Sequence, residues 1–188
     1  MGNFYTNYTL KGPSQQAVAA ALAGRSAVVT PAQEGCVVVF DEASDEQDSA
    51  VITELASRLS RELRCPALAV LNHDDDILWY QLYLSGELAD EYDSSPGYFD
   101  PSAEPSAPAG GDAKRLCQAF GAGDQTAVEA VLRKSSYAED GYVFAFERHA
   151  DIVRVLGIPD WAVGTAYASF ERDEFPEGLS ASTISRTR

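Results

Sequence analysis

The spacing of apolar side chains predicts strands and helices in turn along residues 1–94. Alternating apolar and polar residues predict strands, and apolar residues three or four positions apart predict helices. Gly12, Pro13 and Gly24 end elements, and Ser14 is a suitable helix N-cap. The predicted elements are strands at 4–10, 26–30, 36–40, 68–71 and 77–84, and helices at 15–23 and from near Ser49 to Leu63.

The strand at 77–84 is the predicted centre of the sheet. A turn-forming segment at 72–76 precedes it, so we expect it to pair with residues 68–71 as a β-hairpin. Its two faces carry mostly apolar side chains, which predicts cover on both sides. One face is predicted to hold Ile77, Trp79, Gln81 and Tyr83, and the other Leu78, Tyr80, Leu82 and Leu84.

The order strand, helix, strand, strand, helix, strand predicts an α+β fold. This order is typical of a ferredoxin-like βαββαβ arrangement, in which both helices lie on one face of an antiparallel sheet. The strand at 77–84 then adds a further hairpin strand. The arrangement implies no function, because many unrelated activities occur on it.

A segment rich in proline and glycine separates two parts of the chain. Its composition is typical of an extended linker. The predicted division is a sheet domain at 1–94, a linker at 95–112, a helical subdomain at 113–178 and a disordered tail at 179–188. Helices are predicted at 113–120, 125–133, 150–156 and 161–170, and residues 142–146 fit either a strand or a helix.

Charge and composition narrow the classes of function. With a formal net charge of −15 and no cluster of Lys and Arg, the chain is a poor partner for nucleic acid or an acidic membrane surface. No apolar run approaches the roughly 20 residues that span a bilayer, and the first residues lack the features of a secretory signal. The three cysteines form no C-x-x-C pair, which favours reduced thiols in the cytoplasm.

Motifs for catalysis and metal binding are missing from the sequence. It contains no P-loop, G-x-G-x-x-G, G-x-S-x-G or H-E-x-x-H motif. His73 and the acids at 74–76 offer imidazole and oxygen ligands, but neighbouring residues of one turn cannot all converge on an ion. We therefore interpret this run as an acidic turn that protects a sheet edge, and expect no metal and no cofactor.

Acidic and aromatic residues together mark one candidate surface. The aromatics after residue 84 either dock the linker, with Tyr92 or Tyr98 bonded through its hydroxyl, or present a binding face. A binding face predicts a non-catalytic protein that recognises a basic protein partner by complementary charge. The candidate partner-binding residues are Asp74, Asp75, Glu87, Glu91, Tyr92, Tyr98 and Phe99.

A second hypothesis is a small-molecule binding domain or an enzyme. It places a cleft between the sheet domain and the C-terminal helices, since pockets often form between subdomains. The candidate polar groups of that cleft are Tyr142, Arg148 and His149. A flat acidic patch favours the first hypothesis, and a deep pocket with convergent polar groups favours the second.

Overall fold

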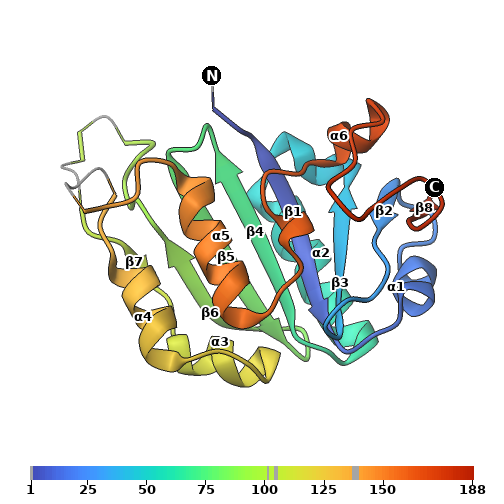
Figure 1. The fold of residues 1–188 in the computed structure, drawn as a ribbon, viewed down its shortest axis with the longest axis horizontal. Coiled ribbons are helices and arrows are strands. Elements are labelled where there is room, and N and C mark those ends of the chain that lie inside the picture. Colours follow the sequence, from blue (N-terminus) through green and yellow to red (C-terminus); the bar gives the residue numbers. More distant parts are fainter. Residues whose placement is uncertain (1, 101, 104–105, 137–139) are drawn as a thin grey trace.

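The computed structural model describes residues 2–100, 102–103, 106–136 and 140–188. In these residues the chain has an α+β fold, with one eight-stranded antiparallel sheet and six α-helices (Figure 1). The strands are β1 (Tyr5–Lys11), β2 (Ala27–Val29), β3 (Cys36–Asp41), β4 (Ala67–His73), β5 (Ile77–Leu84), β6 (Glu87–Asp93), β7 (Ala109–Gly110) and β8 (Ser185–Thr187). The helices are α1 (Gln15–Ala21), α2 (Ser49–Leu63), α3 (Ala113–Phe120), α4 (Gln125–Arg133), α5 (Ala145–Leu156) and α6 (Tyr167–Glu171), with the short 3₁₀ helices η1 (Glu42–Glu46) and η2 (Asp160–Ala162).

The strands lie in the order β7-β6-β5-β4-β1-β3-β2-β8. β1 is central, and its Tyr8 pairs with Val39 of β3 on one side and Ala69 of β4 on the other. At one edge of the sheet, β8 pairs with β2, so that Val28 lies opposite Arg186. The sheet therefore includes residues from both ends of the described chain.

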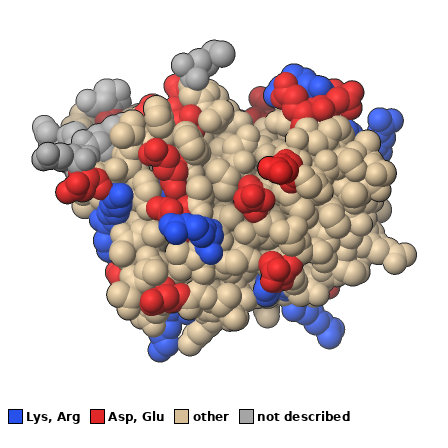
Figure 2. Space-filling model, in the orientation of Figure 1, with Lys and Arg blue, Asp and Glu red and all other residues tan. Residues whose placement is uncertain are grey.

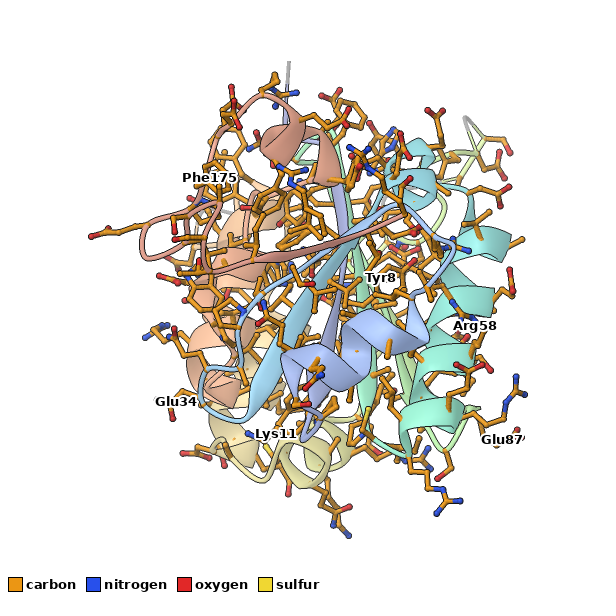
Figure 3. The ribbon with its side chains drawn as sticks, turned by 90° about the vertical axis from the view of Figure 1, so that its right-hand side faces the viewer. Tyr8, Lys11, Glu34, Arg58, Glu87 and Phe175 are labelled. Carbon is orange, nitrogen blue, oxygen red and sulfur yellow. The ribbon has the colours of Figure 1, made fainter. Side chains whose placement is uncertain are left out.

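Helices cover both faces of the sheet. α1 and α2 pack on one face, and α3, α4, α5 and α6 pack on the other, as the side view shows (Figure 3). Because successive strand residues point to opposite faces, β3 supplies Val37 and Val39 to the first side and Val38 and Phe40 to the second. Two buried clusters result, one on each side of the sheet.

Several predicted elements are confirmed. The predicted strand at 77–84 is β5, and the helices at 113–120 and 125–133 are α3 and α4. Trp79 of β5 packs on the side of α1 and α2, whereas Tyr80 lies in the cluster on the other side. The two faces of this strand therefore divide as the alternation predicts.

The C-terminal part differs from the prediction in three places. The helix predicted at 150–156 is longer, because α5 begins at Ala145. The helix predicted at 161–170 is wrong, because the chain forms η2 and then α6, with Gly164 at a φ of +71° between them. The tail at 179–188, predicted to be disordered, contains β8, because its backbone completes the edge of the sheet beside β2. The division into a sheet domain and a helical subdomain stays a prediction; in the structure, side chains from both parts share one core cluster.

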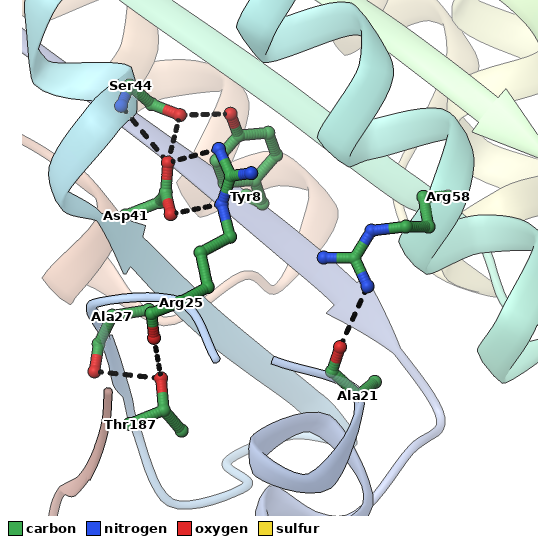
Figure 4. Close-up of polar contacts among 8 residues, drawn as sticks. All are labelled: Tyr8, Ala21, Arg25, Ala27, Asp41, Ser44, Arg58 and Thr187. Atoms are coloured by element: carbon green, nitrogen blue, oxygen red, sulfur yellow. Dashed lines mark hydrogen bonds and ion pairs between the residues drawn. The ribbon is translucent and has the colours of Figure 1, made fainter. Parts of the chain in front are cut away.

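A buried ion pair stabilises the end of β3. Asp41 is fully buried and accepts hydrogen bonds from Nε and Nη2 of Arg25, at 2.6 and 3.0 Å (Figure 4). Ser44 donates its amide and its hydroxyl to the same carboxylate, at 3.0 and 2.6 Å. The hydroxyl of Tyr8 lies 2.6 Å from Ser44 Oγ. The network thus connects β1, the end of β3 and η1 with Arg25, which lies just before β2.

Asp45 caps α6 from a distant part of the chain. Its carboxylate accepts the amides of Tyr167 and Ala168, at 3.2 and 2.9 Å. We expect Asp45→Ala to lower the free energy of unfolding by about 1 kcal/mol, because both amides lose their acceptor. Urea denaturation measures this change. Asp160→Ala, at an exposed position of η2, is the control and should stay within about 0.5 kcal/mol of the wild type; equal losses in both variants would contradict the capping role.

Candidate functional site

Four aromatic rings meet at the end of β4. The ring centroid of His73 lies 4.8 Å from that of Phe4, 6.2 Å from that of Tyr98 and 5.1 Å from that of Phe99. His73 Nδ1 also lies 2.7 Å from Gln47 Oε1, which fixes the imidazole. Phe99 is 72% exposed and Tyr98 is 42% exposed. Exposed aromatic side chains that gather at one place are typical of a binding surface.

A pocket of about 790 Å³ opens beside these rings. It lies on the α2 side of the sheet, between the first turn of α2 and residues 95–100. Leu71 of β4 and Ile77 and Trp79 of β5 give it an apolar lining, to which the rings of His73, Tyr98 and Phe99 add. The pocket is thus largely aromatic and aliphatic.

Three carboxylates line the same pocket, those of Glu46, Asp93 and Asp100. Asp93 Oδ1 accepts the amide of Ser95 at 2.8 Å, and burial raises the pKa of the Asp93 carboxyl above its ordinary value. Within the part of the chain that the structure describes, none of the three forms an ion pair, and no Lys or Arg lines the pocket. This negative charge has no internal counter-charge there, which favours a cationic ligand.

A second pocket, of about 240 Å³, adjoins the first. Trp79 and Asp93 line both pockets, and Glu91 and Gly110 line only the second of these two. We call the two pockets together the acidic–aromatic groove.

The groove is open because α2 begins only at Ser49. Asp48 caps the helix, since its Oδ1 accepts the amide of Ala50 at 2.8 Å. One turn later, Thr53 donates its hydroxyl to Gln81 of β5, so the helix covers the strand from that point. Trp79, two residues earlier on the same strand face, is only half-buried. The Asp48 carboxylate also offsets the positive end of the helix dipole, which would otherwise disfavour a cation.

Two of the predicted partner-binding residues lie in the interior instead. Tyr92 is 1% exposed, and its hydroxyl donates to the Leu132 carbonyl at 2.9 Å. Asp75 is 7% exposed and accepts hydrogen bonds from the Asn3 amide and Asn72 Nδ2, at 2.9 and 2.8 Å. Because their polar atoms are used inside the protein, we leave Tyr92 and Asp75 out of the surface.

The other predicted partner-binding residues divide into two groups. Tyr98, Phe99 and Glu91 line the groove. Asp74 lies in the β4–β5 turn, where its Oδ1 accepts the Gly2 amide at 2.7 Å, and Glu87 lies at the opposite end of β6 from the groove. In Figure 3 the side chain of Glu87 points into solvent. Four of the seven predicted residues therefore border the groove: Glu91, Tyr98 and Phe99 with exposed side chains, and Tyr92 with its side chain buried in the core.

The alternative ligand site is filled by the protein itself. Arg148 is 0% and His149 is 1% exposed. Arg148 Nη1 donates to the Val131 carbonyl at 2.7 Å, and the guanidinium carbon lies 4.5 Å from the ring centre of Tyr142. His149 Nδ1 lies 2.9 Å from the hydroxyl of Tyr5. These contacts hold α5 against α4 and β1, so the three side chains act in the core.

The face covered by α4 and α5 has a different charge pattern. Figure 2 shows acidic and basic side chains lying near one another on this face. Glu129 pairs with Arg133 at 2.9 Å, and Asp151 pairs with Arg154 at 2.5 Å. Because these charges offset one another, they attract a charged partner less than the unpaired carboxylates of the groove do.

The thiols and ligating groups have limited chemistry. In the described ranges, no three His, Cys, Asp or Glu side chains are placed to hold a metal ion. No helix in these ranges has the length and apolarity of a membrane span.

The cysteines are free thiols, and burial raises the pKa of Cys65 to about 11 and that of Cys36 above its ordinary value. At neutral pH these two thiols are therefore protonated and poorly nucleophilic.

Sequence reasoning missed Glu46, Trp79, Asp93 and Asp100 as site residues. The alternation of β5 predicts that Trp79 is covered, and the three acids were not among the residues singled out from the sequence. A regular hairpin of β5 with β6 would place Tyr92 opposite Trp79, and the register shift near Leu82 brings Asp93 there instead. No signal along the chain brings Glu46 to the same place.

No protein-family model, no curated protein and no solved structure shows a significant match to this chain.

Proposed function

We propose that this chain is a non-catalytic interaction protein that binds a basic protein partner in the acidic–aromatic groove. The pocket of about 790 Å³ carries the proposal, because aromatic rings and three carboxylates lie together there. Aromatic rings supply contact area and attract cations, and carboxylates supply the opposite charge. Complementary charge speeds the encounter with a basic surface and rejects acidic competitors.

The charge of the whole chain supports the same class of partner. A formal net charge of −15 attracts a basic protein over a distance of about one Debye length, roughly 8 Å at physiological salt. Binding that depends on this attraction weakens as salt is added.

We further propose a ferredoxin-like core with an added hairpin strand, and a cytoplasmic location. The order β4-β1-β3-β2 within the sheet and the placement of α1 and α2 on one face support the core. β5, the hairpin partner of β4, is the added strand. The free thiols support the location, because reduced cysteines persist in the cytosol.

A retention experiment tests the function. The immobilised protein is exposed to cell lysate at low and at high salt, and retained proteins are identified, purified and titrated against it. We expect a basic protein that is bound at low salt and released at high salt. The variant Glu46→Gln, Asp93→Asn, Asp100→Asn should bind it at least about ten-fold more weakly, which corresponds to about 1.4 kcal/mol.

A second triple variant controls for net charge. Glu54→Gln, Glu171→Gln, Asp173→Asn also removes three negative charges, but at exposed positions outside the groove. It should bind the partner nearly as tightly as the wild type. Equal weakening by both variants would reject the groove as the site, and failure to retain any protein at low salt would reject the function.

A further inference from the structure

We infer that the groove takes one arginine side chain of the basic partner, with its guanidinium stacked on the Trp79 ring and hydrogen-bonded to Asp93. The inference rests on the proposed function and names the chemical group that the groove recognises.

Trp79 and Asp93 form the junction of the groove. They are directly opposite residues of β5 and β6, so their side chains leave the same face of the sheet with Cβ atoms about 5 Å apart. Both also line each of the two pockets. A group held at this junction therefore meets an aromatic ring and a carboxylate together.

Among the residues that the structure describes, Asp93 forms no ion pair. Its carboxylate is half-buried, and among the described residues its hydrogen bond comes from a neutral amide, that of Ser95. Loss of hydration raises the pKa of this carboxyl above its ordinary value, so burial disfavours its charged form. An incoming cation would supply the missing compensation.

A guanidinium fits this junction better than an ammonium does. It is planar, weakly hydrated and able to stack on an indole while its N–H groups donate to a carboxylate. A lysine ammonium is compact and strongly hydrated, so it loses more hydration on entering a half-buried aromatic site. Glu91 lies two residues before Asp93 on β6, opposite Gln81, and offers a second acceptor on the same strand face.

Peptide titration tests the inference on the full chain. The probes are three peptides: acetyl-Gly-Arg-Gly-amide, and two variants of it in which citrulline or lysine replaces the arginine. The chain has two tryptophans, and Trp79→Phe assigns their two indole N–H signals in an NMR spectrum. We expect the arginine peptide to move the Trp79 signal in a saturable way below about 10 mM. The lysine peptide should bind at least about three-fold more weakly, and the uncharged citrulline peptide should leave the signal in place.

Asp93→Asn separates charge from shape. Asparagine keeps an oxygen that can accept the Ser95 amide, so the loop is retained while the charge is lost. We expect the arginine peptide to bind this variant about ten-fold more weakly. Asp173→Asn, an exposed position outside the groove, should bind it as the wild type does.

The outcomes separate the inference from the proposed function. Equal binding of the arginine and citrulline peptides, or no movement of the Trp79 signal up to about 10 mM, overturns the inference. The proposed function survives that result if a basic protein is still retained and released by salt. If no basic protein is retained, the function fails whatever the peptides do.

Discussion

Arg25→Gln is expected to lower the free energy of unfolding by about 3 kcal/mol. The substitution leaves the Asp41 carboxylate fully buried, with its two bonds from Ser44 but without its cation. An uncompensated buried charge costs far more than a lost surface pair. The measurement is urea denaturation, with the slope of the transition compared to show that the unfolded states match.

Arg58→Gln is the matched control for this prediction. The side chains of Arg58 and Arg25 are 26% and 24% exposed, so the two substitutions are made at similarly buried positions. Arg58, however, donates to the Ala21 carbonyl (Figure 4). It also lies 3.5 Å from the exposed Glu62. Its loss should cost about 1 kcal/mol or less. If the two variants lose the same stability, burial of Asp41 does not control the effect.

Stability is expected to fall in acid because His149 must stay neutral in the core. Burial lowers the pKa of His149 from 6.5 to about 3. Between these values the unfolded chain binds a proton that the folded chain does not, so stability decreases as the pH falls. The loss attributable to His149 is about 1.4 kcal/mol for each pH unit below about 6, and about 2 kcal/mol at pH 5 relative to pH 7.

His149→Gln isolates this contribution. Glutamine retains an acceptor for the Tyr5 hydroxyl but does not titrate, while Asp75 near Tyr5 and the other acids remain in both proteins. Urea denaturation of both proteins at pH 7, 6 and 5 gives the comparison. The wild type should lose about 2 kcal/mol more than the variant by pH 5, and parallel losses would show that His149 is protonated within the fold.

The fold could be predicted where an element places apolar side chains against the core at regular spacing. α2 and β5 carry apolar side chains at regular spacing because each packs against the core, and this spacing is visible along the chain. β6 was missed because its outward positions are acidic and its pairing with β5 shifts register near Leu82, which breaks the alternation. β8 was missed because its three half-exposed or exposed residues carry no apolar pattern.

The candidate site could be predicted only in part. Tyr98 and Phe99 stood out as aromatics in a polar segment, and this signal is local. Burial of Tyr92 and Asp75 depends on what packs over them from α4 and the N-terminal segment, which adjacent residues do not encode. Glu46 of η1 and Asp93 of β6 are far apart along the chain but line the same pocket. Their proximity therefore could be found only from the three-dimensional structure.

The pairing of β8 with β2 also determines when this edge of the sheet is covered during synthesis. The hydroxyl of Thr187 donates to the carbonyl of Arg25 at 2.7 Å, across 162 positions of the chain. A ribosome delivers these residues long after β2, so β2 remains an unpaired edge while the nascent chain grows. Until residues 185–187 emerge, neighbouring nascent chains can compete for that edge. Synthesis of β8 therefore covers an edge of the sheet that would otherwise be open to aggregation.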